Sequence, residues 1–600
     1  MSPEERWRGG VLVAAFATLI LGAGCADIPD SGGVSLAQVG GADTEPLIRY
    51  QPPGPPAGAT PVQIVHGFID AMRAYPVSTD AAQQYLSDEG AASWRPERQT
   101  VVYDDISATA TVSGQVVLSV RRVATLDARG SYTPVANRLL DAEHAFALTR
   151  ADGEWRIDNP PDALYVSSDF FADIYQPLSL YFLDRTGRVI VPDPIYLPTG
   201  DQLATSLVRG LLQGPTGDLG RRLRTIVPPS TQVDVSVPVR SNGVAEVRLS
   251  ESVLTLSDAQ REQLAAQLVW TLRQVTGIVG VRILSAGVPL DVPGVADVHN
   301  LNQWDAYAPT DPSLSGQLFA LRRGRLVVVS QTMVSPFEGV GREVSRELSD
   351  FDVDRDFTLL AGVSADRSDV LVGDLSGVPG STLRVLYNDG IDLTDPTWDR
   401  TGSLWVADRR PRGTRMLLFD PQPDRAEGFR RIRMGPLDAA RIEAFALSTD
   451  GLRFVAVTRH VDGSRLGPRR LMMGTVELAG DTRGNQIVDV HEVVTSSVVF
   501  DAPTDVGWTD PTTLSVLARV GTVSPQPYEV RIDGSRVEGG VVPPPEPLLP
   551  PVGAASLATG ASPDSLTYVG NRGGGLWFQD AERQWVRVSR SPLLLPDYPG

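Results

Sequence analysis

The sequence predicts a multidomain chain in which a signal segment and a linker precede two small α+β domains and an all-β propeller of about six blades. The prediction rests on three observations. A short apolar run near the N-terminus ends at the only cysteine. Helical and strand patterns then alternate to about residue 292. Beyond residue 315 the long helical patterns end, and short β runs recur behind acidic turns at intervals of 45 to 60 residues, a period typical of propeller blades.

Residues 1–24 have the features of a secretory signal peptide. The apolar segment Val11–Gly24 is shorter than the roughly 20 residues that span a bilayer, and it ends in small residues. The sequence Leu21–Cys25, LGAGC, resembles the lipobox of bacterial lipoproteins, although Gly22 replaces the usual large apolar residue. That resemblance implies cleavage before Cys25, which becomes an N-palmitoyl, S-diacylglycerol cysteine. The alternative is a plain signal peptide with an incidental cysteine nearby.

A lipidated Cys25 would hold the protein on the extracytoplasmic face of the cell membrane. Each buried CH₂ contributes about 0.8 kcal/mol, so two or more acyl chains make the attachment stable. Residues 25–59 follow as a Pro/Gly-rich tether that ends in QPPGPPAGAT. We expect this tether to lift the folded part of the chain off the membrane.

The composition excludes several classes of function. With 72 acidic and 54 basic residues the net charge is −18, whereas binding to nucleic acid needs a basic surface. There is no lysine, which excludes P-loop phosphate binding, protein-kinase catalysis and Schiff-base chemistry. No two histidines have zinc-ligand spacing, and neither HExxH nor GxSxG occurs. We therefore expect no cofactor, metal site or catalytic residue, and structural or surface roles for His66, His144, His299, His460 and His491.

Residues 60–177 are predicted to form the first α+β domain. Thr60 and Gln63 form a capping box around Pro61, and Ile64 and Phe68 then recur with Met72 on one helical face. Strands are expected at Ile106–Val112, Gln115–Val123 and His144–Arg150. The turn at Asp152-Gly153 predicts that His144–Asp158 is a hairpin.

Residues 178–292 predict a second α+β domain with the order β-β-α-β-β-α-β. The first helix is expected to begin with a capping box of Thr199 and Gln202, and the second with Ser257 and Gln260. Its strands are expected at Leu178–Leu183, Val189–Val191, Gln232–Val237, Gly243–Leu249 and Gly280–Leu284. A linker is expected at 293–314.

The propeller is predicted over residues 315–590. Each blade turn carries an aspartate before a β run, and these aspartates are Asp354, Asp399, Asp450, Asp510 and Asp564. Leu318–Val329 would supply one further blade, and seven blades are the alternative to six. The proline run Val541–Pro551 is interpreted as a stiff inter-blade loop, with a docking segment as the alternative. Residues 591–600 are expected to form a C-terminal tail.

Residues 179–215, SLYFLDRTGRVIVPDPIYLPTGDQLATSLVRGLLQGP, resemble the GerMN domain of spore-germination and related envelope proteins. The order of signal, lipobox, α+β domain, GerMN-like domain and propeller resembles the actinobacterial LpqB lipoprotein family. The resemblance implies an accessory protein that contacts the extracytoplasmic sensor domain of a membrane histidine kinase (MtrB-like). It would thereby modulate MtrAB two-component signalling, which is linked to the cell envelope and division. It implies no catalytic residues.

Two other functions remain open from the sequence. An envelope-ligand (glycan or peptidoglycan) binding lipoprotein would present exposed tryptophans near a cleft, whereas Trp155, Trp270, Trp398, Trp405 and Trp508 lie on packing patterns. A propeller hydrolase would need an acidic pair that converges in a pocket. Arginines also cluster in expected blade loops, where they meet either an acidic partner, anionic head groups or only solvent. These clusters are Arg409, Arg410, Arg412 and Arg415, and Arg430, Arg431 and Arg433.

Overall fold

The computed structural model describes residues 49–600 except for short segments. The segments left out are 112–114, 136–141, 216, 218, 311–315, 338–347, 376–382, 421–427, 464, 479–483, 496–499, 522–523, 536–552, 563 and 581–583. Cys25, most of the tether and the proline run Val541–Pro551 therefore lie outside the described residues. Within the described part of the chain, no helix is long and apolar enough to cross a membrane.

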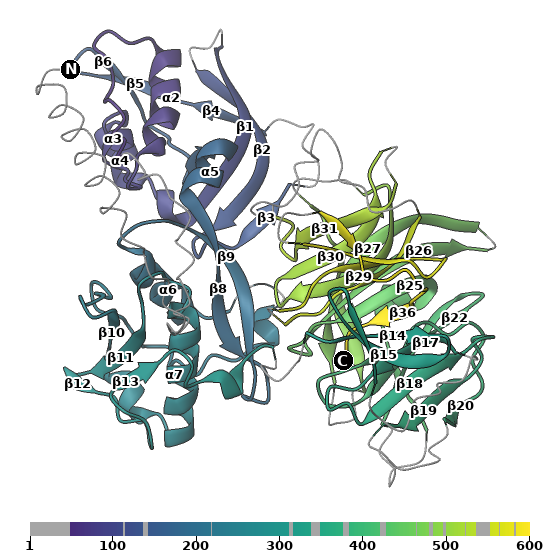
Figure 1. The fold of residues 1–600 in the computed structure, drawn as a ribbon. Helices are drawn as coiled ribbons and strands as arrows, with labels where there is room; N and C mark the ends of the chain where they lie inside the picture. The colour runs from purple at the N-terminus through teal and green to yellow at the C-terminus, as the bar shows by residue number, and fades with distance from the viewer. Residues whose placement is uncertain are drawn as a thin grey trace, which may run out of the picture. The chain divides into compact units, whose positions relative to one another are not determined.

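The first domain is built around helix α2 (Pro61–Asp70), which packs against a five-stranded sheet (Figure 1). The predicted capping box of Thr60 and Gln63 is confirmed. The sheet runs in the order β3-β2-β1-β7, with β4 paired to β2. Its strands are β1 (Gln99–Ala110), β2 (Val116–Asp127), β3 (Tyr132–Pro134), β4 (Ala142–Phe146) and β7 (Leu164–Ser167). The shorter helices are α3 (Asp80–Gln83), α4 (Asp88–Ser93) and α5 (Ser168–Ile174).

The expected single hairpin His144–Asp158 is wrong, because its first half joins the main sheet. Phe146 of β4 is fully buried and its ring lies 6.2 Å from that of Phe68 of α2. Strand β4 pairs with β2, and this pairing holds the Phe146 ring under the helix. Only β5 (Leu148–Ala151) and β6 (Glu154–Ile157) form the hairpin.

The second domain places two helices and a hairpin around one apolar core (Figure 1). Strands β8 (Tyr175–Leu183) and β9 (Ile190–Pro198) pair antiparallel along their whole length. Helix α7 (Asp258–Leu272), with its predicted Ser257–Gln260 capping box confirmed, connects two parallel strands. These are β10 (Val244–Leu249) and β11 (Gly280–Ser285), and β12 (Val288–Pro289) and β13 (Val298–Asn300) extend the sheet. Because β13 pairs with β11, the expected linker 293–314 contributes a strand to this domain.

Two local predictions in this domain are wrong. Helix α6 (Leu203–Leu212) has Gln202 at its N-cap with no side-chain hydrogen bond, so the expected Thr199–Gln202 box does not form. The chain instead enters the helix through a turn at Gly200, whose φ is +138°. Segment 232–237 makes only an isolated bridge to β10, because side chains of α6 satisfy its backbone: Thr205 accepts from the Val237 amide and Arg209 donates to the Val235 carbonyl.

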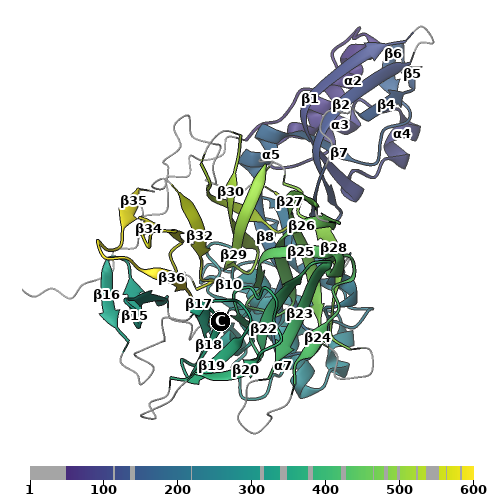
Figure 2. The ribbon, with the colours of Figure 1, turned by 90° about the vertical axis from the view of Figure 1, so that its right-hand side faces the viewer.

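The C-terminal region consists of six antiparallel sheets (Figure 2). The first sheet contains β14 (Leu318–Arg322), β15 (Arg325–Ser330), β16 (Met333–Pro336) and β36 (Leu594–Asp597). The second contains β17 (Leu348–Val353), β18 (Leu359–Ser364), β19 (Val370–Asp374) and β20 (Arg384–Tyr387). The third contains β21 (Thr397–Trp398), β22 (Leu404–Arg410), β23 (Gly413–Phe419) and β24 (Arg430–Ile432).

The remaining sheets follow the same antiparallel order. The fourth contains β25 (Ala440–Leu447), β26 (Arg453–Asp462), β27 (Arg465–Glu477) and β28 (Gln486–Glu492). The fifth contains β29 (Ala502–Asp510), β30 (Thr513–Arg519) and β31 (Gln526–Arg531). The sixth contains β32 (Ala554–Ala558), β33 (Tyr568–Asn571), β34 (Leu576–Gln579) and β35 (Trp585–Arg587).

The inner strands of these sheets form a closed circuit. Strand β17 contacts β36 and β21, β22 contacts β25, β25 contacts β29, and β32 contacts both β29 and β36. Residues 591–600, expected as a tail, therefore contain the strand that completes the first sheet, since β36 pairs with β14. The ends of the propeller sequence are joined by main-chain hydrogen bonds, which leaves no open sheet edge at that seam.

Four of the five blade-turn aspartates, Asp354, Asp399, Asp450 and Asp510, accept hydrogen bonds from amides of the turn that follows. Asp354 accepts hydrogen bonds from the amides of Thr358 and Leu359, at 2.7 and 2.8 Å. Asp399 accepts from the amides of Thr401 and Ser403. A carboxylate that accepts several amide protons fixes the turn that feeds the next strand.

Candidate functional site

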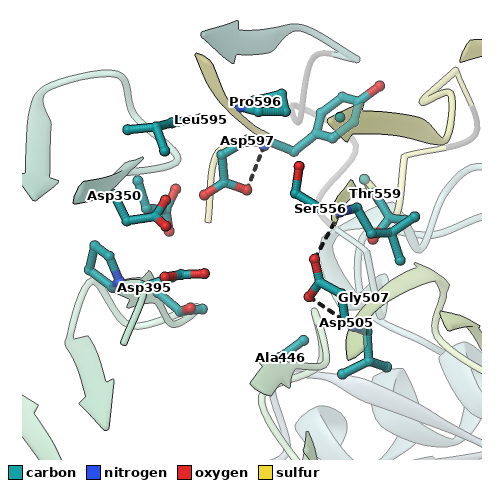
Figure 3. Close-up of a pocket in the computed structure, with 18 of the residues that line it drawn as sticks. Asp350, Asp395, Ala446, Asp505, Gly507, Ser556, Thr559, Leu595, Pro596 and Asp597 are labelled. Atoms are coloured by element: carbon teal, nitrogen blue, oxygen red, sulfur yellow. Dashed lines mark hydrogen bonds between the residues drawn. The ribbon is translucent and has the colours of Figure 1, made fainter. Parts of the chain in front are cut away.

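The inner strands of the propeller enclose a cavity of about 480 Å³ (Figure 3). Strands β17, β25, β29, β32 and β36 line it, together with residues just before β21. Five carboxylates belong to this lining: Asp350, Asp352, Asp395, Asp505 and Asp597. In Figure 3 the side chains of Asp350, Asp395 and Asp597 point toward one another across the cavity. The site is therefore acidic and is assembled from strands that are distant in sequence.

The repeat of the blades places these residues. Five cavity residues lie four positions before a blade-turn aspartate: Asp350, Asp395, Ala446, Val506 and Gly560, which precede Asp354, Asp399, Asp450, Asp510 and Asp564. Strand β29 has register shifts on both sides of this position, and its cavity carboxylate, Asp505, stands one residue earlier. The turn aspartates alone were used to predict the blades. Counting back four residues from each would have pointed to Asp350 and Asp395.

Asp350 and Asp395 form a hydrogen-bonded carboxyl pair. Burial raises the pKa of Asp350 well above its usual range, and the nearby charges of Asp395 and Asp597 raise it further. Two carboxylates cannot share a hydrogen bond without a proton between them. The two carboxyl groups therefore share one proton.

Burial also raises the pKa values of the other three carboxyl groups, Asp352, Asp505 and Asp597. Burial raises the pKa of Asp352 to about 8 and that of Asp505 to about 7, although backbone amides oppose both shifts. Asp505 accepts from the amides of Leu557 and Val506, at 2.8 and 2.9 Å. Burial, with the charges of Asp352 and Asp395, raises the pKa of Asp597 well above its usual range.

Asp352 has an unsatisfied oxygen. Its side chain is almost fully buried, with 2% of the residue exposed. One carboxylate oxygen, Oδ2, accepts from the Trp398 amide at 3.0 Å, whereas Oδ1 has no hydrogen-bond partner. Buried polar atoms are normally hydrogen-bonded, so such an atom marks a functional or strained site.

Within the described residues, none of the five carboxylates forms an ion pair. The arginine that most influences Asp350 is Arg367, which lowers its pKa but donates its own hydrogen bond to the Leu393 carbonyl, at 2.9 Å. In the described part of the chain, no group of three or more His, Cys, Asp or Glu side chains is arranged to hold a metal ion. The cavity lining thus holds five carboxyl groups and two arginines, Arg367 and Arg572, without the geometry of a metal centre.

Of the histidines, tryptophans and clustered arginines considered from the sequence, only Trp508 lines the cavity. His299 is buried against Trp304 and burial lowers its pKa, whereas His66 and His144 are half-buried. The surfaces of His460 and His491 are exposed, and no histidine lines the cavity.

The packing role predicted for the tryptophans is confirmed. Trp398 and Trp405 are 1% exposed and Trp508 is 4% exposed. Trp155 and Trp270 are half-buried against the cores of the first and second domains. Only Trp508 lines the cavity, and its indole N–H has no acceptor. The exposed aromatic platform expected of a glycan-binding cleft is thus not made by these tryptophans.

The arginine clusters lie on strands more than in loops. Arg409 and Arg410 end β22 and form ion pairs with Asp392 and Asp408, both at 2.5 Å. The exposed members of the two clusters are Arg412, Arg415, Arg430, Arg431 and Arg433. None of them lines the cavity.

The acidic pair that a hydrolase would need is present, but its geometry does not suit glycoside hydrolysis. Retaining and inverting glycosidases separate their two carboxyl groups by roughly 5 to 9.5 Å to admit the sugar or a water. Asp350 and Asp395 are instead in direct hydrogen-bond contact.

Comparison with known proteins identifies each domain. Residues 54–172 match the model of the lipoprotein LpqB N-terminal domain, and residues 179–291 match the sporulation and spore germination (Germane) domain. Residues 324–599 match the lipoprotein LpqB β-propeller domain. The first GerMN domain of GerM from Bacillus subtilis is 21% identical, with a TM-score of 0.18, and covers 21% of this chain and 97% of its own. TolB from Acinetobacter baumannii is 14% identical, with a TM-score of 0.33, and covers 58% of this chain and 87% of its own.

Two relatives match along most of the chain. Lipoprotein LpqB of Streptomyces coelicolor is 30% identical over 592 residues, covering 90% of this chain and 91% of the relative. Lipoprotein LpqB of Thermobifida fusca is 28% identical over 588 residues, covering 88% and 90%. The predicted fold of two small α+β domains, the second GerMN-like, followed by a propeller is confirmed. The chain therefore belongs to the lipoprotein LpqB family.

Proposed function

We propose that the protein is a membrane-anchored extracytoplasmic accessory lipoprotein that contacts the sensor domain of an MtrB-like membrane histidine kinase and modulates MtrAB signalling. One observation carries the proposal: all three domain models of this family match the chain in order. The kinase is the partner implied by the family resemblance. The signal and lipobox that end at Cys25 support the anchoring.

The anchor gives a weak contact a physical advantage. A diacylated Cys25 confines the protein to the membrane surface that also carries the kinase sensor domain. The tether of about 34 residues, as a loose coil, spans on average roughly 30–35 Å, which lets the folded domains reach a neighbouring receptor. Confinement raises the effective concentration of the two partners, so that even a low affinity is populated.

Binding changes kinase activity only if it favours one sensor conformation over the other. The accessory protein needs no chemistry of its own for this effect. The direct contact between Asp350 and Asp395, which departs from glycosidase spacing, is consistent with such a role.

The proposal is tested by separating binding from anchoring. Residues 26–600 are titrated against the purified sensor domain, both in solution and on lipid vesicles that carry it. We expect saturable binding in solution and tighter apparent binding when the lipidated protein is on the vesicle. In cells, Cys25→Ala should weaken the signalling response, although residues 26–600, which lack Cys25, still bind the sensor domain in solution. No binding at high protein concentration on either platform would overturn the proposal.

The anchor is checked separately by mass spectrometry of the mature N-terminal peptide. We expect a peptide that begins at Cys25 and carries the mass of a diacylglycerol thioether and an N-acyl chain. A mature chain with an unmodified thiol would remove the basis for membrane confinement.

A further inference from the structure

We propose that the propeller cavity is a binding site for an organic cation, an alkylammonium or guanidinium group that sits among Asp350, Asp395 and Asp597 (Figure 3). No residue in this cavity is needed for the function proposed above. The inference therefore stands or falls on its own measurements.

The first support is a set of buried carboxyl groups that have no ion-pair partner among the described residues. Burying a carboxylate is costly unless it is paired or well hydrogen-bonded. Other buried carboxylates of the propeller meet this requirement, since Asp408 pairs with Arg410 and Asp450 with Arg453. The five cavity carboxylates have no such partner among the described residues. A cation supplied from outside would complete the arrangement.

The second support is two buried polar atoms in the lining that have no hydrogen-bond partner. Asp352 is 2% exposed and lines the cavity, yet its Oδ1 has no hydrogen-bond donor. Trp508, 4% exposed, lines the same cavity with an indole N–H that has no acceptor. A ligand that carries N–H donors satisfies the carboxylate oxygen. An accompanying carbonyl or hydroxyl would satisfy the indole.

The shape and lining of the cavity favour an organic cation over a metal ion. In the described residues the acidic side chains do not converge as metal ligands. A volume of about 480 Å³ lies within the range of small-molecule sites and far exceeds a bare ion. Phe445, Leu447 and Leu557 line the space beside the carboxylates. Apolar walls of this kind pack against the methylene stem of an alkylammonium or guanidinium group.

The same chemistry has two sources, a free polyamine and a basic side chain of a polypeptide. Spermidine serves as the probe for the first and N-acetylarginine amide for the second. N-acetylglutamine amide is the neutral control, and calcium chloride tests the metal alternative. Titration calorimetry is performed at low ionic strength on residues 26–600, which contain the whole unit Tyr50–Gly600.

The decisive variant replaces the acidic pair by amides and keeps its shape. We expect Asp350→Asn/Asp395→Asn to bind the cationic probe about tenfold more weakly or worse, the loss that goes with a charge-assisted hydrogen bond. Asp462→Asn makes the same kind of charge change at an exposed residue of the propeller outside the cavity, and it should bind like the wild type. Asp395→Asn alone is the second variant, used if the double variant does not melt cooperatively.

Saturation by spermidine or by N-acetylarginine amide supports the proposal, and the tighter probe identifies the source. Three results would overturn it. These are no heat from either probe at millimolar concentration, equal losses in the cavity and Asp462→Asn variants, or saturation by calcium alone with spermidine inert.

Discussion

Two groups of buried aspartates in the propeller differ in their partners. In the second strands and turns of the blades, Asp408 and Asp450 have fully buried side chains and pair with Arg410 and Arg453, at 2.5 and 2.8 Å. In the cavity, Asp350 and Asp352 form no ion pair within the described residues. Arginine partners thus accompany these two buried aspartates but not the aspartates of the cavity. We infer that the cavity carboxylates are not required for folding, and four predictions test this inference.

The largest effect is expected from breaking a paired site. Arg453→Met leaves the fully buried Asp450 without its counter-ion, which typically costs about 3–5 kcal/mol. Denaturant unfolding of the propeller transition measures the loss. A loss below about 1 kcal/mol would show that the paired aspartates are no more essential to the fold than the cavity ones.

Replacing a cavity carboxyl group should not lower the free energy of unfolding as the loss of Arg453 does. Asp350→Asn replaces one member of the proton-sharing pair by a neutral amide, which can donate a hydrogen bond to Asp395 without that proton. At neutral pH we expect unchanged stability or a gain of up to about 1 kcal/mol, as is common when a binding-site residue is neutralised. The same unfolding experiment decides the sign. A clear destabilisation would place Asp350 among the structural aspartates.

The third prediction concerns pH. In the folded state the pKa of Asp352 is raised to about 8 by burial, so the folded protein holds a proton that the unfolded chain releases near pH 4. This contribution to stability is complete below pH 4 and is lost as the pH rises toward 8. The negative charge of Asp354 raises the pKa of Asp352 further, and the charge of Asp352 in turn raises the pKa of Asp597. Thermal melting should fall less steeply between pH 5 and 8 in Asp352→Asn than in the wild type. If the melting temperatures of the two proteins fall equally with pH, the raised pKa of Asp352 is contradicted.

The smallest effect is expected from an exposed pair. Arg470 and Glu492 lie 3.1 Å apart with side chains 59% and 46% exposed. Solvent screens such a pair, so Arg470→Met should change stability by less than about 1 kcal/mol. A loss comparable to that of Arg453→Met would mean that burial is not what separates the two groups of aspartates.

Local signals in the sequence predicted local structure well. The capping boxes at Thr60 and Ser257 involve contacts within four residues, and both form. The box expected at Thr199 fails because the chain turns at Gly200. The turn at Asp399 forms as predicted because its partners follow within the next six residues.

The cavity was much harder to predict, because its parts come from distant strands. Asp350 and Asp395 each lie four residues before a blade-turn aspartate, so counting along the sequence could have identified them. Asp597 was not, because it reaches the cavity only when β36 pairs with β14, and the paired residue Phe319 lies far away in the sequence. Nothing in the sequence around residue 597 indicates that pairing.

The most direct test of the contrast between paired and unpaired aspartates is the melting temperature with and without spermidine. A ligand that binds only the folded state raises this temperature. Spermidine should raise it in the wild type and in Asp462→Asn, and should have little effect on Asp350→Asn/Asp395→Asn. Equal shifts in all three proteins, or no shift in the wild type with either spermidine or N-acetylarginine amide, would contradict a cation site in the cavity.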